Sequence, residues 1–341
     1  MRSRVRLLGA LAALVAVAVL AGACGSSSGS SSSSSGGSSK PGSNFKIGLV
    51  TDIGGLNDKG FNHLAYVGLQ RAARQLGVQV RVEQSTSGSD YVPNLTTLAA
   101  QHYNLVIANG FLMDGAIKEV AKQFPSINFA IIDDAPSPSP PNVLGLLFKE
   151  QESGYSAGYL AALMSKTHVV STVGGQKLPA VDHYIAGFQA GAKAAYPSTT
   201  ALNDYSNSFT DNAKCKSLAL NQIAQHSDVV FAVAGGCGLG ALSAAQEKGV
   251  WGIGVDADQS YLGSYILTSA IKKVDVAVYD TIQSVINGTF QGGGISTFDA
   301  TKGATGLGII NPKVPANIRA KVLAVEQKVK DGTIVPPNVV K

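Results

Sequence analysis

The sequence predicts an α/β protein of two lobes, each with a parallel sheet between layers of helices. From Phe45 onward, apolar segments of strand length alternate with amphipathic segments of helix length. The strand segments lack a regular alternation of polar and apolar residues, which is typical of parallel strands buried on both faces. This part of the chain spans about 300 residues, more than one hydrophobic core usually serves, so two lobes are expected.

Residues 1–23 have the pattern of a bacterial signal peptide. Three arginines precede an apolar run at residues 7–20, and small residues follow up to Ala23. The run is shorter than the ~20 residues that a membrane-spanning helix needs, so cleavage is expected. Cys24 directly follows the small residues and is the predicted site of lipid attachment. Residues 24–44, which begin with Cys24, are predicted to form a flexible tether, because they are nearly all serine and glycine.

The net charge, the remaining cysteines and the histidines indicate which partners, bonds and metal sites to expect. Without the leader, 24 basic residues stand against 22 acidic ones, so no nucleic-acid partner is predicted. Export to an oxidising compartment favours a disulfide between Cys215 and Cys237, with two buried free thiols as the alternative. The five histidines are scattered, and no zinc-type spacing of cysteines or histidines occurs, so no metal site is predicted.

The first lobe is expected to comprise residues 45–142 and 272–292. Its strands are predicted at residues 46–51, 78–83, 105–108 and 128–133. Its helices are predicted at residues 61–76, 92–101, 114–123 and 274–286. The proline-rich residues 135–141 can continue neither a helix nor a central strand, so we expect them to form a crossing between the lobes.

The second lobe is expected to comprise residues 143–271 and 293–341. Its strands are predicted at residues 143–148, 168–173, 199–205, 229–234 and 251–255. Its helices are predicted at residues 152–164, 184–195, 212–226 and 239–248.

Polar residues, glycines and one aromatic follow several of the predicted strands directly. They are Asp52, Asn109, Phe111, Asp133, Asp134, Gly235, Gly236, Asp256 and Asp258. Ligands of open parallel sheets bind outside the carboxyl ends of the strands, where helix N-termini present free N–H groups. The repetition of such residues at one topological position therefore predicts a binding site for a polar molecule.

Two phenylalanines, Phe61 and Phe209, follow polar loops at the start of predicted helices, one in each lobe. Two such rings can stack on a planar ligand, which would close the lobes around it. The alternative is that both rings only pack their helices against the sheets.

Two hypotheses of enzymatic function are alternatives to a binding protein. Residues 236–241 fit the G-x-G-x-x-G/A pattern of dinucleotide sites, with Asp256 twenty residues after Gly236. The motif lies deep in the chain of an exported protein, however, and no Tyr-x-x-x-Lys pair occurs, so the glycines more simply allow close approach of the backbone to a ligand. The acid pairs Asp133/Asp134 and Asp256/Asp258 could serve hydrolysis, but ionised carboxylates also bind ligand donors without catalysis. No catalytic residue and no cofactor are predicted.

Residues 51–62, Thr-Asp-Ile-Gly-Gly-Leu-Asn-Asp-Lys-Gly-Phe-Asn, resemble the D-x-G-x-x-D-K-S-F-N signature of the basic membrane protein (BMP) family of substrate-binding lipoproteins. Further similar segments follow in order at residues 109–111, 131–134, 152–158, 187–193, 254–259 and 268–272. The resemblance implies a type I periplasmic-binding fold of two Rossmann-like lobes joined by a hinge of several crossings. It also implies a receptor, on the outer face of the cell membrane, for a purine nucleoside that an ABC permease and its ATPase import.

The resemblance further implies roles for single residues. Asp52, Asn62 and Asn109 would lie at the ligand, and Phe61 and Phe209 would sandwich a base. Asp134 would accept a hydrogen bond from the base. Asp256 and Lys272 would hold the ribose, and Gly235 and Gly236 would bring the backbone close.

The sequence departs from the family pattern at Gly60, where serine is usual, and at residues 236–238 and 181–184. A free sugar or another small polar solute therefore remains an alternative ligand. An exported enzyme acting on nucleosides or dinucleotides, and a surface lipoprotein for recognition without transport, remain alternative functions.

Overall fold

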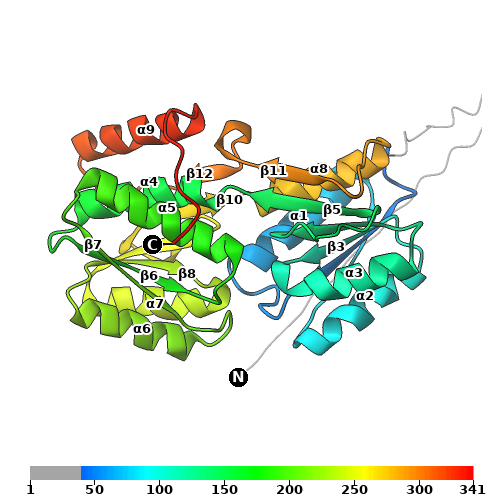
Figure 1. Cartoon of the computed structure of the whole chain (residues 1–341), viewed down its shortest axis with the longest axis horizontal. Coiled ribbons are helices and arrows are strands. Elements are labelled where there is room, and N and C mark those ends of the chain that lie inside the picture. Colours follow the sequence, from blue (N-terminus) through cyan, green and yellow to red (C-terminus); the bar gives the residue numbers. More distant parts are fainter. Residues whose placement is uncertain (1–39, 341) are drawn as a thin grey trace, which may run out of the picture. The chain divides into compact units, whose positions relative to one another are not determined.

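The structure, a computed structural model, describes residues 40–340 and contains two six-stranded sheets covered by helices on both faces (Figure 1). It confirms the α/β class predicted from the sequence. The leader, Cys24 and most of the tether lie outside the described residues. Within residues 40–340, no helix is both long and apolar enough to cross a membrane.

The first lobe is built on a sheet whose strands are all parallel. In spatial order they are β11 (Ile295–Phe298), β5 (Val143–Phe148), β4 (Asn128–Ile132), β3 (Leu105–Asn109), β1 (Lys46–Thr51) and β2 (Gln79–Glu83). Helices α1 (Phe61–Leu76) and α8 (Val274–Ile286) bury apolar side chains against one face of the sheet. Helices α2 (Tyr91–Ala100) and α3 (Asp114–Gln123) cover the other face.

The second lobe repeats this plan with one antiparallel edge strand, β12. In spatial order its strands are β12 (Thr305–Leu307), β10 (Ile266–Lys272), β9 (Trp251–Asp256), β8 (Val229–Val233), β6 (Val169–Gly174) and β7 (Thr200–Tyr205). Helices α4 (Glu150–Met164) and α5 (Pro179–Ala195) pack on one face, and α9 (Ala316–Lys330) packs on α4. Helices α6 (Asn212–Ala224) and α7 (Gly235–Lys248) cover the other face.

Short 3₁₀ turns complete the described elements. They are η1 (Gly88–Asp90), η2 (Phe111–Met113), η3 (Ser260–Leu262) and η4 (Ala300–Lys302). A disulfide joins Cys215 of α6 to Cys237 of α7.

Two strands lie in a different lobe from the one expected. Residues 143–148 and the segment after residue 293 were assigned to the second lobe, but β5 pairs with β4, and β11 pairs with β5, in the first sheet. Residues 135–141 therefore connect two neighbouring strands of one lobe. Their prolines stop regular structure, but nothing in them specifies to which sheet the chain returns.

The chain crosses between the lobes after β5, after β10 and between β11 and β12. Hydrogen bonds tie these crossings together. The backbone N–H of Lys149 donates to the carbonyl of Phe298 at 3.0 Å, and that of Lys273 donates to Ala304 at 2.8 Å. The Lys149 ammonium also lies 3.0 Å from the Asp299 carboxylate. The three crossings thus form one connected region on which a hinge motion can act.

Candidate ligand-binding site

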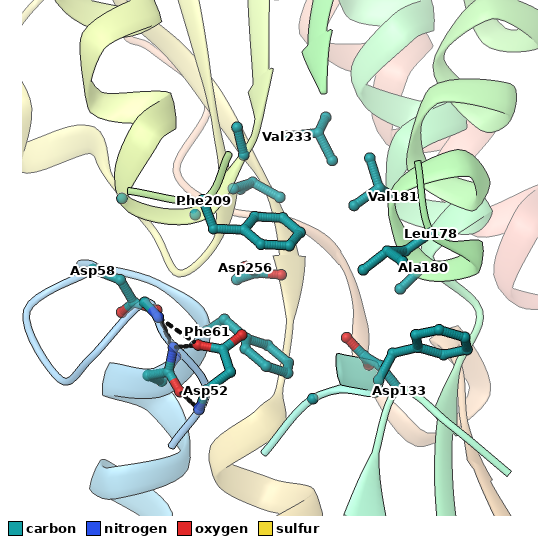
Figure 2. A pocket seen from close by; sticks show the side chains of 18 of the residues that line it. Asp52, Asp58, Phe61, Asp133, Leu178, Ala180, Val181, Phe209, Val233 and Asp256 are labelled. Atoms are coloured by element: carbon teal, nitrogen blue, oxygen red, sulfur yellow. Dashed lines mark hydrogen bonds between the residues drawn. The ribbon is translucent and has the colours of Figure 1, made fainter. Parts of the chain in front are cut away.

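A pocket opens between the two lobes, where strand ends from both sheets face each other (Figure 2). Carboxylates, aromatic rings, aliphatic side chains and glycine backbone form its wall. The first lobe contributes Asp52, Gly54, Asp58, Phe61, Asn62, Gly110, Phe111, Leu112 and Asp133. The second lobe contributes Leu178, Ala180, Val181, Tyr184, Phe209, Val233, Ala234, Gly235, Gly236, Val255, Asp256 and Lys272.

The loop before α1 is held in place by two buried carboxylates. Asp58 accepts hydrogen bonds from the backbone N–H groups of Gly60, Asn62 and His63 at 2.7–3.1 Å, so it caps the N-terminus of α1. Asp52 accepts from the Asn62 amide at 2.7 Å. The first residue of the capped helix is Phe61, and the loop therefore fixes the position from which its ring enters the pocket.

Phe61 and Phe209 approach the same pocket from opposite lobes, as Figure 2 shows. Phe209 lies in the loop between β7 and α6, where Gly175 gives it room. A Cβ atom at residue 175 would lie only 2.3 Å from the Phe209 ring. The carbonyl of Phe209 also accepts the N–H of Cys237 at 2.9 Å, which links the ring to the first turn of α7.

Glycine supplies the pocket wall at the start of α7. This helix begins at Gly235, four residues before the start predicted at residue 239. Gly235 and Gly236 are therefore part of its first turn, where backbone N–H groups have no partner within the helix. Without side chains, they leave this end of the helix open to a ligand.

Lys272, at the end of β10, is a buried ammonium surrounded by carboxylates. Its Nζ atom lies 2.6 Å from Asp133, 3.5 Å from Glu150 and 3.9 Å from Asp256. Nζ also lies 4.8 Å from the centroid of the Phe61 ring. Because Asp133 follows a strand of the first lobe, this ion pair joins the two lobes.

Burial is the largest cause of the pKa shifts of the pocket carboxyl groups. It raises the pKa of Asp52 and of Asp256 to about 6 each. Burial also raises the pKa of Asp133 to about 7, although the Lys272 ammonium opposes the shift. For Lys272, burial by itself would lower the pKa, but Asp133, Asp256 and Glu150 outweigh it and raise the pKa. One ammonium cannot neutralise three carboxylates, so Asp133 and Asp256 hold their protons to a higher pH than exposed carboxyl groups do.

Lowering the pH from 8 to 5.5 is expected to stabilise the ligand-free protein. The pKa values of Asp52, Asp133 and Asp256 are raised above their ordinary value, so the folded state binds more protons than the unfolded chain between about pH 4 and 7. The penalty of their burial is fully present above pH 7 and is relieved as the pH falls through 7 and 6. Urea unfolding at constant ionic strength measures this change. Asp133→Asn should flatten the dependence, and a wild-type stability that falls over this range would contradict the assignment.

The sequence-predicted site residues mostly gather in this pocket. Those that line it are Asp52, Phe61, Asn62, Phe111, Asp133, Phe209, Gly235, Gly236, Asp256 and Lys272, whereas Asp258 does not line it. Asn109 lies behind the wall, where its amide donates to Asn62 at 2.9 Å. Asp134 is not among the lining residues. Burial and the neighbouring Asp114 carboxyl raise its pKa to about 7, while Asp133 faces the pocket instead.

Sequence reasoning missed several residues of the site. Tyr184 lines the pocket and donates its hydroxyl to Asp256 at 3.1 Å. It was expected as the first residue of a helix and as part of the departure from the family pattern at residues 181–184, but not as a site residue. Helix α5 begins five residues earlier at Pro179, a residue favoured in the first turn. Asp58 and Glu150 were also missed. The proximity of Asp58 to Phe61 in the chain was the available signal, whereas no local signal marked Glu150.

Comparison with known proteins agrees with this architecture. A family model described as "ABC transporter substrate-binding protein PnrA-like" matches residues 45–338. A Listeria monocytogenes protein named "CD4+ T-cell-stimulating antigen" is 36% identical and covers 96% of this chain and 97% of its own. A Lactococcus lactis protein named "ABC transporter nucleoside-binding protein BmpA" is 34% identical, over 99% of this chain and all of its own.

Solved structures show the same fold. A solute-binding protein of an ABC transporter system from Aeropyrum pernix superposes with a TM-score of 0.79 at 26% identity, covering 86% of this chain and 94% of its own. The family match, the relatives and the fold confirm the resemblance found in the sequence. The chain belongs to the PnrA-like family of ABC-transporter substrate-binding proteins.

Proposed function

We propose that this protein captures a nucleoside between its lobes and delivers it to a membrane permease driven by a separate ATPase. The observation that carries the proposal is the pair of rings, Phe61 and Phe209, that reach one pocket from opposite lobes. A purine base between them would gain stacking energy only when the lobes close. The name of the Lactococcus lactis relative supports the same ligand class.

The polar groups of the pocket suit the remainder of a nucleoside. Asp256 and Lys272 lie next to each other and can accept from and donate to ribose hydroxyls. Asp133 lies on the pocket wall and has one carboxylate oxygen without a hydrogen-bond partner among the described residues. Asp134 also has such an oxygen but does not line the pocket, so we assign Asp133, in its place, as the acceptor for a donor on the base.

The charge of the pocket favours an uncharged ligand. Asp52, Asp58, Asp133 and Asp256 line it, with Lys272 as the one cationic residue among the lining side chains. A phosphate group would meet like charges in a partly desolvated site, so a nucleotide should bind more weakly than its nucleoside. The proposal is binding without chemistry: Asp52 and Asp58 hold the loop before α1, and Asp133 and Asp256 pair with Lys272 and offer their remaining acceptor capacity to the ligand.

The signal peptide pattern supports export, and Cys24 is the proposed lipid anchor. Both lie outside the described residues. Such an anchor would hold the folded part on the outer face of the cell membrane, at the end of the serine- and glycine-rich tether.

Calorimetric titration tests the proposal. The chain from Phe45 onward, refolded to remove bound ligand, is expected to bind inosine, adenosine or guanosine at one site. Stacking of a base on an aromatic ring contributes about 1–3 kcal/mol, so Phe61→Ala and Phe209→Ala should each weaken binding roughly ten- to hundredfold. Inosine monophosphate should bind more weakly than inosine.

Phe290→Ala is the matched control, because Phe290 is a partly buried ring of the first lobe that does not line the pocket. It should leave the affinity unchanged. Binding of free ribose but of no nucleoside would keep the fold and replace the ligand. Release of free base from a nucleoside during the titration would indicate an enzyme instead.

A further inference from the structure

Gln259 is a buried glutamine in the second lobe, three residues beyond the end of β9. Its lobe holds it at two points. The backbone N–H of Gln259 donates to the Ser269 hydroxyl at 3.0 Å, and its side-chain oxygen accepts the N–H of Val255 at 3.2 Å. The absence of a side chain at Gly254 makes this possible, because a Cβ atom there would lie 2.5 Å from that oxygen.

The other end of the same side chain reaches the first lobe. The amide nitrogen Nε2 donates to the carbonyl of Lys59 at 3.2 Å, across 200 residues of sequence. Lys59 lies between Asp58, which caps α1, and Gly60, which precedes Phe61. The acceptor thus belongs to a loop that is itself fixed by hydrogen bonds. Both partners of the contact are therefore positioned by hydrogen bonds within their own lobes.

Gln259 is not among the residues that line the pocket. It nevertheless joins the segment after β9 to the loop before α1, and both segments border site residues, since Asp256 ends β9 and Phe61 begins α1. Nearby backbone also approaches closely across the lobes. A Cβ atom at Gly60 would lie 3.6 Å from Asp256, and one at Gly236 would lie 3.8 Å from the backbone of Asp58.

We propose that Gln259 is a positioning residue whose bond to Lys59 stabilises the closed arrangement of the lobes before a ligand arrives. The proposal extends the binding function but does not depend on which solute is bound. The apparent affinity of a ligand falls in proportion to the population of the binding-competent state. Loss of one buried hydrogen bond should therefore weaken binding about two- to tenfold without changing the order of preference among ligands.

The test measures the distance between the lobes directly. Spin labels on cysteines introduced at the exposed residues Lys122 and Asn221 report on the first and second lobes. In the ligand-free protein, Gln259→Met keeps the side-chain length but removes the donor to Lys59, together with the acceptor for Val255, so the longer, open distances should become more populated. Inosine should restore the short distances, but the variant should bind it about two- to tenfold more weakly than the wild type does.

A second variant and a control separate this role from a general loss of stability. Gln259→Glu can still accept from Val255 but cannot donate to Lys59, so it should open the lobes even if the methionine variant fails to fold. Gln222 is another buried glutamine of the second lobe, and it donates only within its lobe, to Thr172 and Asp204. Gln222→Met should lower stability but leave the distances unchanged.

Wild-type distances in both folded Gln259 variants would overturn the proposal. This outcome differs from a failure of the nucleoside assignment, because the distances of the ligand-free protein are informative even if no nucleoside binds.

Discussion

Replacing Lys272 by methionine is expected to destabilise the protein by about 3–5 kcal/mol at pH 8, the usual effect of removing one partner of a buried charge cluster. The ammonium lies among Asp133, Glu150 and Asp256, and the substitution leaves these carboxylates buried without a cation. Methionine fills a similar volume, so the loss would arise from charge and not from a cavity. Urea unfolding followed by circular dichroism measures it.

The pH dependence of this loss identifies its cause. At pH 5.5 the carboxylates of Asp133 and Asp256, whose pKa values are raised to about 7 and about 6, take up protons more readily, so the loss should shrink. Lys273→Met, at the exposed neighbouring residue, is the control and should have little effect at either pH. An equal loss at pH 8 and pH 5.5 would indicate that packing, and not charge, explains the result.

Removal of the disulfide is expected to have the next largest effect. The bond closes a loop across 22 residues, which corresponds to about 3 kcal/mol of stabilisation in the chain-entropy model. The variant with Cys215→Ser and Cys237→Ser should lose about this much in an unfolding experiment. It should also bind its ligand more weakly, because Cys237 follows Gly236 and donates its backbone N–H to the carbonyl of Phe209.

Reduction of the wild-type protein provides the matched experiment. A reductant should lower the stability of the wild type to that of the double variant and leave the double variant unchanged. If stability falls but the affinity for the ligand does not, the disulfide supports α6 and α7 without positioning the pocket wall.

The sequence alone predicted the elements that carry the site. Apolar runs of strand length, such as the strand predicted at residues 105–108, and the amphipathic segments that follow them are local properties. The rule that ligands bind at the carboxyl ends of parallel strands then placed Asp52 and Asp256 at one site, and the structure has both on the pocket wall. The place of Phe61 at the start of a predicted helix marked it as a possible stacking ring, and the family signature at residues 51–62 added Asn62.

The sequence does not show which of two adjacent residues faces the pocket. Asp133 and Asp134 both follow β4, and sequence position cannot tell which carboxylate turns toward the second lobe. The structure gives Asp133 a positive φ of 64° and directs it to Lys272, while Asp134 lies near Asp114. The starts of α5 at Pro179 and of α7 at Gly235 also differ from the predicted starts at residues 184 and 239.

The sequence by itself determined the fold class, most strands and helices, and the strand ends at which the pocket lies, because these follow from local apolar patterns and from the geometry of parallel sheets. Only the tertiary structure decided which sheet receives β5 and β11, which carboxylates surround Lys272, and that Gln259 bonds to Lys59. These features join residues separated by as many as 200 positions, and their energies depend on burial and direction, which arise only when the two lobes meet.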